Sequence, residues 1–185
     1  MLRHRLLALL LAWAGLAAAE ATVPICYGYG CNAQAQIRYS ERQLREVSRQ
    51  LAVAVDPAEE RKMLAAAIGR LYGWAGEQSD IGNDRAGNYA DGHAPGKMDC
   101  IDHSTSTTRL LQLLETRGSL RWHRVLEPDA RNWALVIPVH YSAVIEEKAA
   151  GDGVRFVVDS WFVDNGQAAV ILPLEEWKGG AGPDV

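Results

Sequence analysis

Apolar and polar positions divide the chain into an apolar leader, three helix-like stretches and a run of strand-like stretches. The leader is the Leu- and Ala-rich run 6–16, which follows Arg3 and Arg5. A positive start, an apolar run and small residues next to it are typical of an export signal peptide, with cleavage after Ala19 or, as a second choice, after Ala21. Because the run is shorter than the roughly twenty residues that span a bilayer, we expect the leader to be removed and no stable membrane insertion to remain.

Two amphipathic helices follow the leader. Ser40 and Gln43 have the spacing of a capping box, and apolar residues then recur at helical intervals, at Leu44, Val47 and Leu51. Asp56 and Pro57 supply an N-cap and a first-turn proline for a second helix, which the apolar pattern extends to about Trp74. The sequence therefore predicts two helices in the first half of the chain.

A long irregular loop is predicted next, because residues 76–98 are rich in Gly, Asn and Asp and contain few large apolar side chains. Loops of that length in small domains are usually functional or disordered. Helical spacing returns directly afterwards, with Ile101, Thr105, Thr108, Leu111 and Leu114 on one face. A third helix should therefore begin almost at Cys100 and stop at Gly118.

The last third of the chain reads as strands. Four runs of apolar, aromatic and β-branched residues, separated by Pro128, by Gly151-Asp-Gly153 and by Asn165-Gly166, span residues 120–126, 134–146, 154–163 and 169–173. Helices followed by hairpin-linked strands indicate an α+β fold in which the helices pack on an antiparallel sheet. With 185 residues in all, we expect a signal peptide (1–19) and one domain (20–185).

Charge excludes one class of partner. The formal net charge is −4 and the pI about 5.7, with basic residues scattered along the chain. A nucleic-acid-binding domain would carry a clustered basic surface, so we expect no nucleic acid as a partner. The oligomeric state is left open by the sequence.

If the protein is exported, two of the three cysteines can form a disulfide, because disulfides persist outside the cytoplasm. Cys26 and Cys31 flank the short Tyr-Gly-Tyr-Gly segment, whose glycines allow a tight loop that brings the two sulfurs together. They are the natural disulfide pair. Cys100 is then the odd cysteine, which indicates a reactive thiol or an intermolecular bridge; a buried, inert thiol is the alternative.

The predicted position of Cys100 suits a nucleophile. A cysteine in the first turn of a helix faces unpaired backbone N–H groups and the positive end of the helix dipole, and both favour thiolate over thiol. Thiolate is the form that attacks acyl carbon, and the same N–H groups can hold an oxyanion.

Two polar residues interrupt predicted strands that are otherwise apolar. His140 does so in the second strand and Asp159 in the third, and buried polar groups need partners. If Ile145 pairs with Val154, antiparallel register puts His140 opposite Asp159, on the same face. A helix-start cysteine, a strand histidine and a strand aspartate then match the nucleophile, base and orienter of a catalytic triad.

Three segments carry a resemblance to a known superfamily: Met98-Asp-Cys100-Ile-Asp102-His-Ser, His140-Tyr-Ser-Ala-Val and Val157-Val-Asp159-Ser-Trp. They resemble the transglutaminase-like superfamily, and bacterial transglutaminase-like cysteine proteinases in particular. The resemblance implies a papain-like core, attack of Cys100 on an amide or related acyl group, His140 as base and Asp159 as orienter. Export would put a peptide, protein or peptidoglycan-peptide substrate within reach, and we expect no cofactor.

Two alternatives use the same residues. Cys100, His103 and His140, with His93 or Asp159, offer ligands that suit zinc, although the paired spacing of a strong zinc motif is missing. A catalytically silent periplasmic binding or assembly module with the same fold is the other. The simpler interpretation of the helix start is that Asp99 and Asp102 cap it and His103 faces solvent. Candidate side-chain oxyanion donors, by residue type alone, are Gln78, Asn83 and Asn88.

Overall fold

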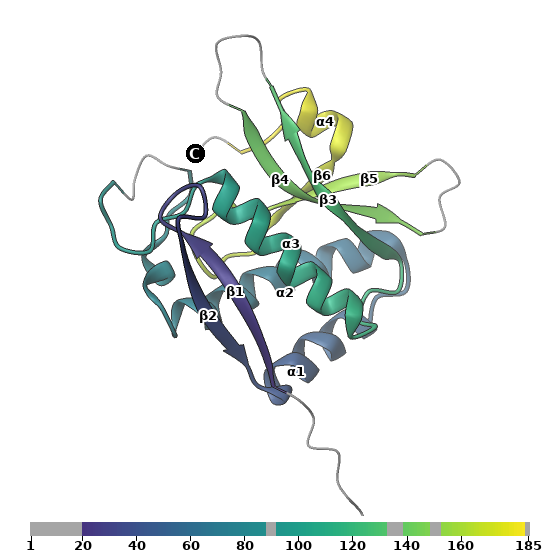
Figure 1. Ribbon diagram of the computed structural model, residues 1–185. Coiled ribbons are helices and arrows are strands. Elements are labelled where there is room, and N and C mark those ends of the chain that lie inside the picture. The colour runs from purple at the N-terminus through teal and green to yellow at the C-terminus, as the bar shows by residue number, and fades with distance from the viewer. Residues whose placement is uncertain (1–19, 88–91, 133–138, 149–152, 184–185) are drawn as a thin grey trace, which may run out of the picture.

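A computed structural model of the protein describes residues 20–87, 92–132, 139–148 and 153–183. The described chain is an α+β fold with two antiparallel sheets (Figure 1). The predicted signal peptide, Asn88 and the predicted beginning of the second strand (134–138) lie outside the described residues. No helix within the described ranges combines the length and apolar character needed to cross a membrane.

A β-hairpin that the sequence analysis did not predict comes first. It joins β1 (Ala21–Tyr27) to β2 (Ala33–Tyr39), with Ala21 paired to Tyr39 and Tyr27 to Ala33. Alternate side chains on one face of the hairpin are buried in the main core, namely Val23, Ile25, Ile37 and Tyr39. The hairpin is thus one wall of the domain.

The first two helices form where predicted. Helix α1 (Glu41–Ala52) begins with the Ser40 and Gln43 capping box, and α2 (Pro57–Gly76) with Asp56 as N-cap and Pro57 in the first turn. Both bury apolar faces in the main core. The long loop after α2 has one short 3-10 helix, η1 (Asp80–Asn83), among its described residues.

Helix α3 (Cys100–Thr116) runs through the centre of the molecule. Figure 1 shows it between the hairpin and the larger sheet, and it lies next to both β1 and β4. It begins at Cys100 as predicted, and the left-handed backbone of Gly118 (φ 69°) follows its end. The helix therefore places Cys100 at the end of the sheet where β4 begins.

The larger sheet has the order β3-β4-β5-β6 and is antiparallel throughout. Its strands are β3 (His123–Arg131), β4 (His140–Glu147), β5 (Arg155–Asp159) and β6 (Val170–Pro173). The prediction that Pro128 ends the first strand is wrong, because the ladder shifts register between Leu126 and Asp129 and the strand continues. The third strand is shorter than predicted, and a short helix, α4 (Leu174–Lys178), was not predicted.

The two faces of this sheet contribute to different cores. Ala143, Ile145 and Val158 face the main core, to which α3 belongs. Val144 and Val157 face a smaller core with Phe162, Leu174 and Trp177. Because side chains alternate along a strand, His140 and Asp159 belong to the face covered by α4.

Candidate active site

Cys100 is a partly buried free thiol at the first position of α3. Asp99 caps the helix, and its Oδ1 accepts the N–H groups of Ile101 at 3.0 Å and Asp102 at 2.9 Å. The His103 N–H donates to the Asp99 carbonyl. Within the part of the chain that the structure describes, the N–H of Cys100 has no acceptor, so it is free to bind an incoming oxygen.

The sulfur of Cys100 reaches the start of β4. Its Sγ lies 3.8 Å from the carbonyl oxygen of Val139, the residue before His140. A side-chain hydrogen bond with Cys100 and the charge of Cys100 are among the causes that raise the pKa of His140. Since Nε2 of His140 is bound to Asp159, Nδ1 is the nitrogen that remains for the sulfur.

His140 and Asp159 are in direct contact. The distance from His140 Nε2 to Asp159 Oδ2 is 2.8 Å. The predicted register is wrong by two residues, since Ala143 and not Tyr141 pairs with Val158. An even displacement keeps both side chains on one face, and the long imidazole reaches the carboxylate diagonally.

Asp159 is buried among hydrogen-bond donors. Its side chain is 1% exposed. The indole N–H of Trp177 donates to Oδ2 at 3.0 Å, and the backbone N–H of Trp161 donates to Oδ1 at 3.2 Å. These donors fix the direction of the buried carboxylate. Sequence analysis missed Trp177, which arrives from α4 at the far end of the chain.

Aromatic rings enclose His140. The ring centroids of Trp161, Phe162 and Trp177 lie 4.6, 5.6 and 5.6 Å from that of the imidazole. Burial alone would lower the pKa of His140, but the hydrogen bond and charge of Asp159, together with Cys100, raise it to about 9. With its pKa raised in this way, the His140 ring favours the protonated, positively charged form at neutral pH.

His103 does not face solvent as predicted. Its ring is buried, with Nδ1 2.9 Å from Ser160 Oγ and Nε2 3.0 Å from Asp84 Oδ2. Both nitrogens are thus directed away from Cys100. Among the described residues, the ligand atoms of Cys100, His103 and His140 do not converge, and His93 and Asp159 do not complete them. The zinc alternative therefore has no assembled ligand set here.

The His103 ring belongs to a buried brace that sequence analysis did not find. We define the brace as Asp84, His103 and Ser160. Asp84 Oδ1 accepts the N–H of Met98 at 2.8 Å, two residues before Cys100, and Ser160 directly follows Asp159. The brace therefore ties the start of α3 to the end of β5.

A small cavity of about 10 Å³ lies beside the brace, with Asn165 in its lining. Its size suits a single water molecule. Among the described residues, the buried Nδ2 of Asn165 has no hydrogen-bond partner, and the buried Oδ2 of Asp84 has only its ionic contact with His103 Nε2. The two atoms offer an acceptor and a donor, so the cavity has the polar lining that a buried water needs.

The predicted disulfide between Cys26 and Cys31 is present. Asp102 lies against it and, besides its part in the α3 cap, accepts N–H groups from Tyr29 at 2.8 Å and Cys31 at 2.7 Å. Burial raises the pKa of Asp102 to about 6, and the charge of Asp99 adds to this against the effect of the N–H donors. Asp102 thus links the hairpin turn to the helix that carries Cys100.

The side-chain candidates for an oxyanion donor have other roles. Gln78 exchanges hydrogen bonds with the backbone of Arg38, at 2.9 and 3.1 Å, and the Asn83 amide donates to the Pro95 carbonyl at 3.2 Å. Asn88 lies outside the described residues. The N–H of Cys100 is therefore the donor that the described geometry offers.

Comparisons of the chain with protein-family models, with curated proteins and with solved structures found no match.

Proposed function

We propose that the protein is an exported cysteine-dependent hydrolase or acyltransferase with a transglutaminase-like, papain-like core, acting on an amide of a peptide, a protein or a cell-wall peptide. One observation carries the proposal. A single imidazole, His140, interacts with the free thiol at the start of α3 and with a buried carboxylate on the neighbouring strand. That is the connectivity of a nucleophile, base and orienter.

The chemistry follows from these positions. The Cys100 thiolate attacks the carbonyl carbon, and the N–H of Cys100 stabilises the oxygen on which negative charge develops. The C–N bond breaks as the His140 imidazolium gives its proton to the departing amine. Water or a second amine then attacks the thioester while His140 accepts a proton, and Cys100 leaves as thiolate. Hydrolysis and acyl transfer differ only in which nucleophile arrives.

Asp159 keeps the imidazole ready for both steps. It holds Nε2 at 2.8 Å, so Nδ1 faces the reaction. It also balances the positive charge of the imidazolium, because the carboxylate is buried and oriented by the Trp177 indole. A base fixed in this way transfers protons without reorienting between steps.

Export is part of the proposal, and one described feature is compatible with it. The disulfide between Cys26 and Cys31 is compatible with an extracytoplasmic location. Strand β1 begins at Ala21, which pairs with Tyr39. Cleavage after Ala19 would leave the whole strand in place, whereas cleavage after Ala21 would remove its first pair.

Selective alkylation tests the proposal. The protein without its first nineteen residues is treated with iodoacetamide from pH 5 to pH 10, and the Cys100 adduct is followed by mass spectrometry. We expect Cys100 to react faster than glutathione at pH 6–7. In His140→Ala, we expect the pH dependence of the Cys100 alkylation rate to move to higher pH. His93→Ala is the matched control, because it removes a histidine whose side chain is exposed. If Cys100 were alkylated slowly and His140→Ala did not change its alkylation rate, the result would instead support the silent binding module.

A further inference from the structure

The turn between β1 and β2 has an uncommon backbone. Four successive residues are left-handed, with φ of 83° at Gly28, 68° at Tyr29, 66° at Gly30 and 57° at Cys31. Glycine adopts this conformation freely, but Tyr and Cys do so at a cost in free energy. Such a turn persists only where its surroundings hold it. The Cys26–Cys31 disulfide closes it covalently.

The N–H groups of this turn bind the two carboxylates that begin α3. Tyr29 and Cys31 donate to the two oxygens of Asp102 at 2.8 and 2.7 Å, and Gly30 donates to Asp99 Oδ2 at 2.9 Å. The same two carboxylates form the capping box of α3. Cys100 lies between them in the chain, so its place depends on groups that the turn holds.

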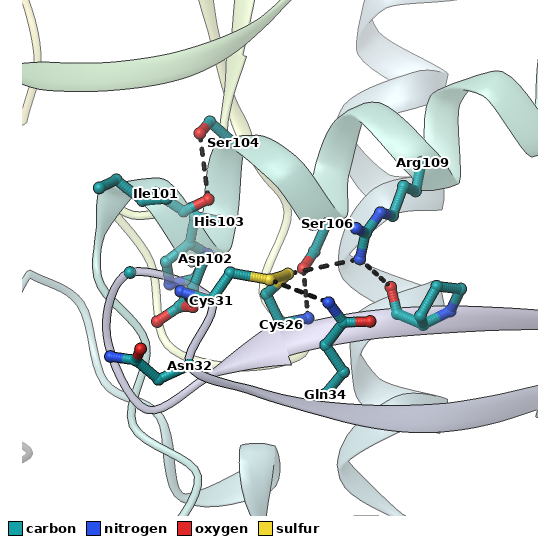
Figure 2. Close-up of a disulfide and its surroundings, with 12 residues drawn as sticks. Cys26, Cys31, Asn32, Gln34, Ile101, Asp102, His103, Ser104, Ser106 and Arg109 are labelled. Carbon is teal, nitrogen blue, oxygen red and sulfur yellow. Dashed lines mark hydrogen bonds between the residues drawn. A yellow bond between two sulfur atoms is a disulfide. The ribbon is translucent and has the colours of Figure 1, made fainter.

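The disulfide itself is seated on α3 (Figure 2). The Cys26 N–H donates to Ser106 Oγ at 2.8 Å, and Arg109 Nη1 lies 3.3 Å from the Cys26 sulfur. The Gln34 amide lies 3.4 Å from the Cys31 sulfur. An oxygen of Asp102 and the two sulfurs fall within 4.8 Å of one another. These sulfurs are bonded to each other and not to a metal, so the cluster serves to hold the turn on the helix.

We propose that the disulfide turn is a positioning element of the active site, with Asp102 as the positioning residue, and that Cys100 is held in reach of His140 only while Cys26 and Cys31 are oxidised. This inference rests on the proposed function. A dithiol such as dithiothreitol transfers two electrons and two protons to the sulfur–sulfur bond, which breaks to give two thiols, while the dithiol becomes a cyclic disulfide. Tyr29 and Cys31 then relax out of the left-handed region and their N–H groups leave Asp102.

The first experiment removes the disulfide and keeps Cys100 as the single remaining thiol. The double variant Cys26→Ser, Cys31→Ser is alkylated with iodoacetamide at pH 7 and compared with the oxidised protein. We expect the Cys100 rate to fall by roughly tenfold or more, since small displacements of reacting groups have effects of this size. We also expect the pH profile to move to higher pH. Val47→Ala in α1 is the control, because it weakens the buried core without touching the turn.

The second experiment tests the route through Asp102. In the oxidised protein, Asp102→Ala should slow Cys100 alkylation as the double variant does, and Asp102→Asn, which keeps one acceptor, should restore part of the rate. Combining Asp102→Ala with loss of the disulfide should slow Cys100 alkylation little more than either change alone, because both changes act through the same hydrogen bonds. Circular dichroism identifies the variants that are folded.

The outcomes separate the two proposals. If the oxidised protein alkylates no faster than glutathione, the proposed function fails. If Cys100 is fast in the oxidised protein and equally fast in folded Asp102→Asn and in the dithiothreitol-reduced protein, the proposed function stands and the positioning role is overturned. If the reductions in alkylation rate from Asp102→Ala and from loss of the disulfide were fully additive, the inference that the disulfide acts through Asp102 would be overturned.

Discussion

Trp177 donates its indole N–H to the same Oδ2 of Asp159 that binds Nε2 of His140, at 3.0 Å against 2.8 Å. The indole is fully buried and its ring also packs beside the imidazole. One residue of a short C-terminal helix therefore fixes both the direction of the carboxylate and one wall of the histidine pocket. Helix α4 is therefore part of the candidate site.

Trp177→Phe should keep the aromatic packing and remove the donor to Asp159. We expect a loss of about 1–2 kcal/mol in the free energy of unfolding, as for a buried acceptor that loses one partner. We also expect slower turnover with little change in KM, because only the orientation of the triad is altered. Urea unfolding and steady-state kinetics measure the two effects. Trp74→Phe, in the main core away from Asp159, is the control and should leave turnover unchanged.

His140→Ala and Asp159→Asn should separate base from orienter. Losing the imidazole removes both the proton carrier and the partner of the thiolate, so turnover and Cys100 alkylation should both fall. Asp159→Asn should leave the fold intact and lower kcat/KM by about 10²- to 10⁴-fold, because the imidazole loses its fixed tautomer and its counter-charge. Alkylation should fall less in Asp159→Asn than in His140→Ala. Equal alkylation rates in the two variants and the parent protein would argue against a triad.

The raised pKa of His140 makes stability depend on pH in a definite direction. The folded pKa is about 9, and an unfolded histidine titrates near 6.5. Its contribution, on the order of 3 kcal/mol, is fully present below pH 6.5 and is lost as pH rises through 9. Urea unfolding at pH 6, 7.5 and 9.5 should show this loss in the parent protein. The His140→Ala variant should show a flatter profile, and an equal slope in both would exclude His140 as the source.

Local sequence signals predicted the helices well, because their determinants lie within one turn. The capping box at Ser40 and the first-turn Pro57 mark helix starts without reference to the rest of the chain. Strand β1 was missed even though Val23 and Ile25 alternate along it, and it contains Pro24, a residue that is uncommon in strands. In the structure Pro24 occupies a two-stranded hairpin, where the loss of its N–H is tolerated.

The sequence singled out the three candidate residues but not their surroundings. His140 and Asp159 interrupt apolar strands, and Cys100 is the odd cysteine at a helix start. The partners of His103 come from a loop and from the end of β5, so no periodicity could show that the ring is buried. The alternation of side chains shows which residues share a face of the sheet, but it does not show which residues of neighbouring strands are paired. A register displaced by two residues therefore fits the sequence pattern equally well.

Asp84→Asn should reveal how far the buried brace supports the active site. The asparagine keeps an acceptor for the Met98 N–H but places a neutral amide where the carboxylate faces His103 Nε2 at 3.0 Å. Because a buried charged partner is lost, we expect a decrease of roughly 2–4 kcal/mol in the free energy of unfolding. We also expect slower Cys100 alkylation at temperatures where the variant is folded, because the side chain that holds the Met98 N–H, two residues before Cys100, loses its ion pair with His103.

Ser160→Ala is the matched control for the brace. It removes the hydroxyl that lies 2.9 Å from Nδ1 of His103 and 2.8 Å from Oγ1 of Thr107, and it leaves the contact of the His103 ring with Asp84 intact. We expect a smaller loss of stability, about 1–2 kcal/mol for two neutral hydrogen bonds, and an alkylation rate close to that of the parent protein. If Asp84→Asn lowered stability but left the alkylation rate and its pH profile unchanged, the brace would serve the core alone and not the position of Cys100.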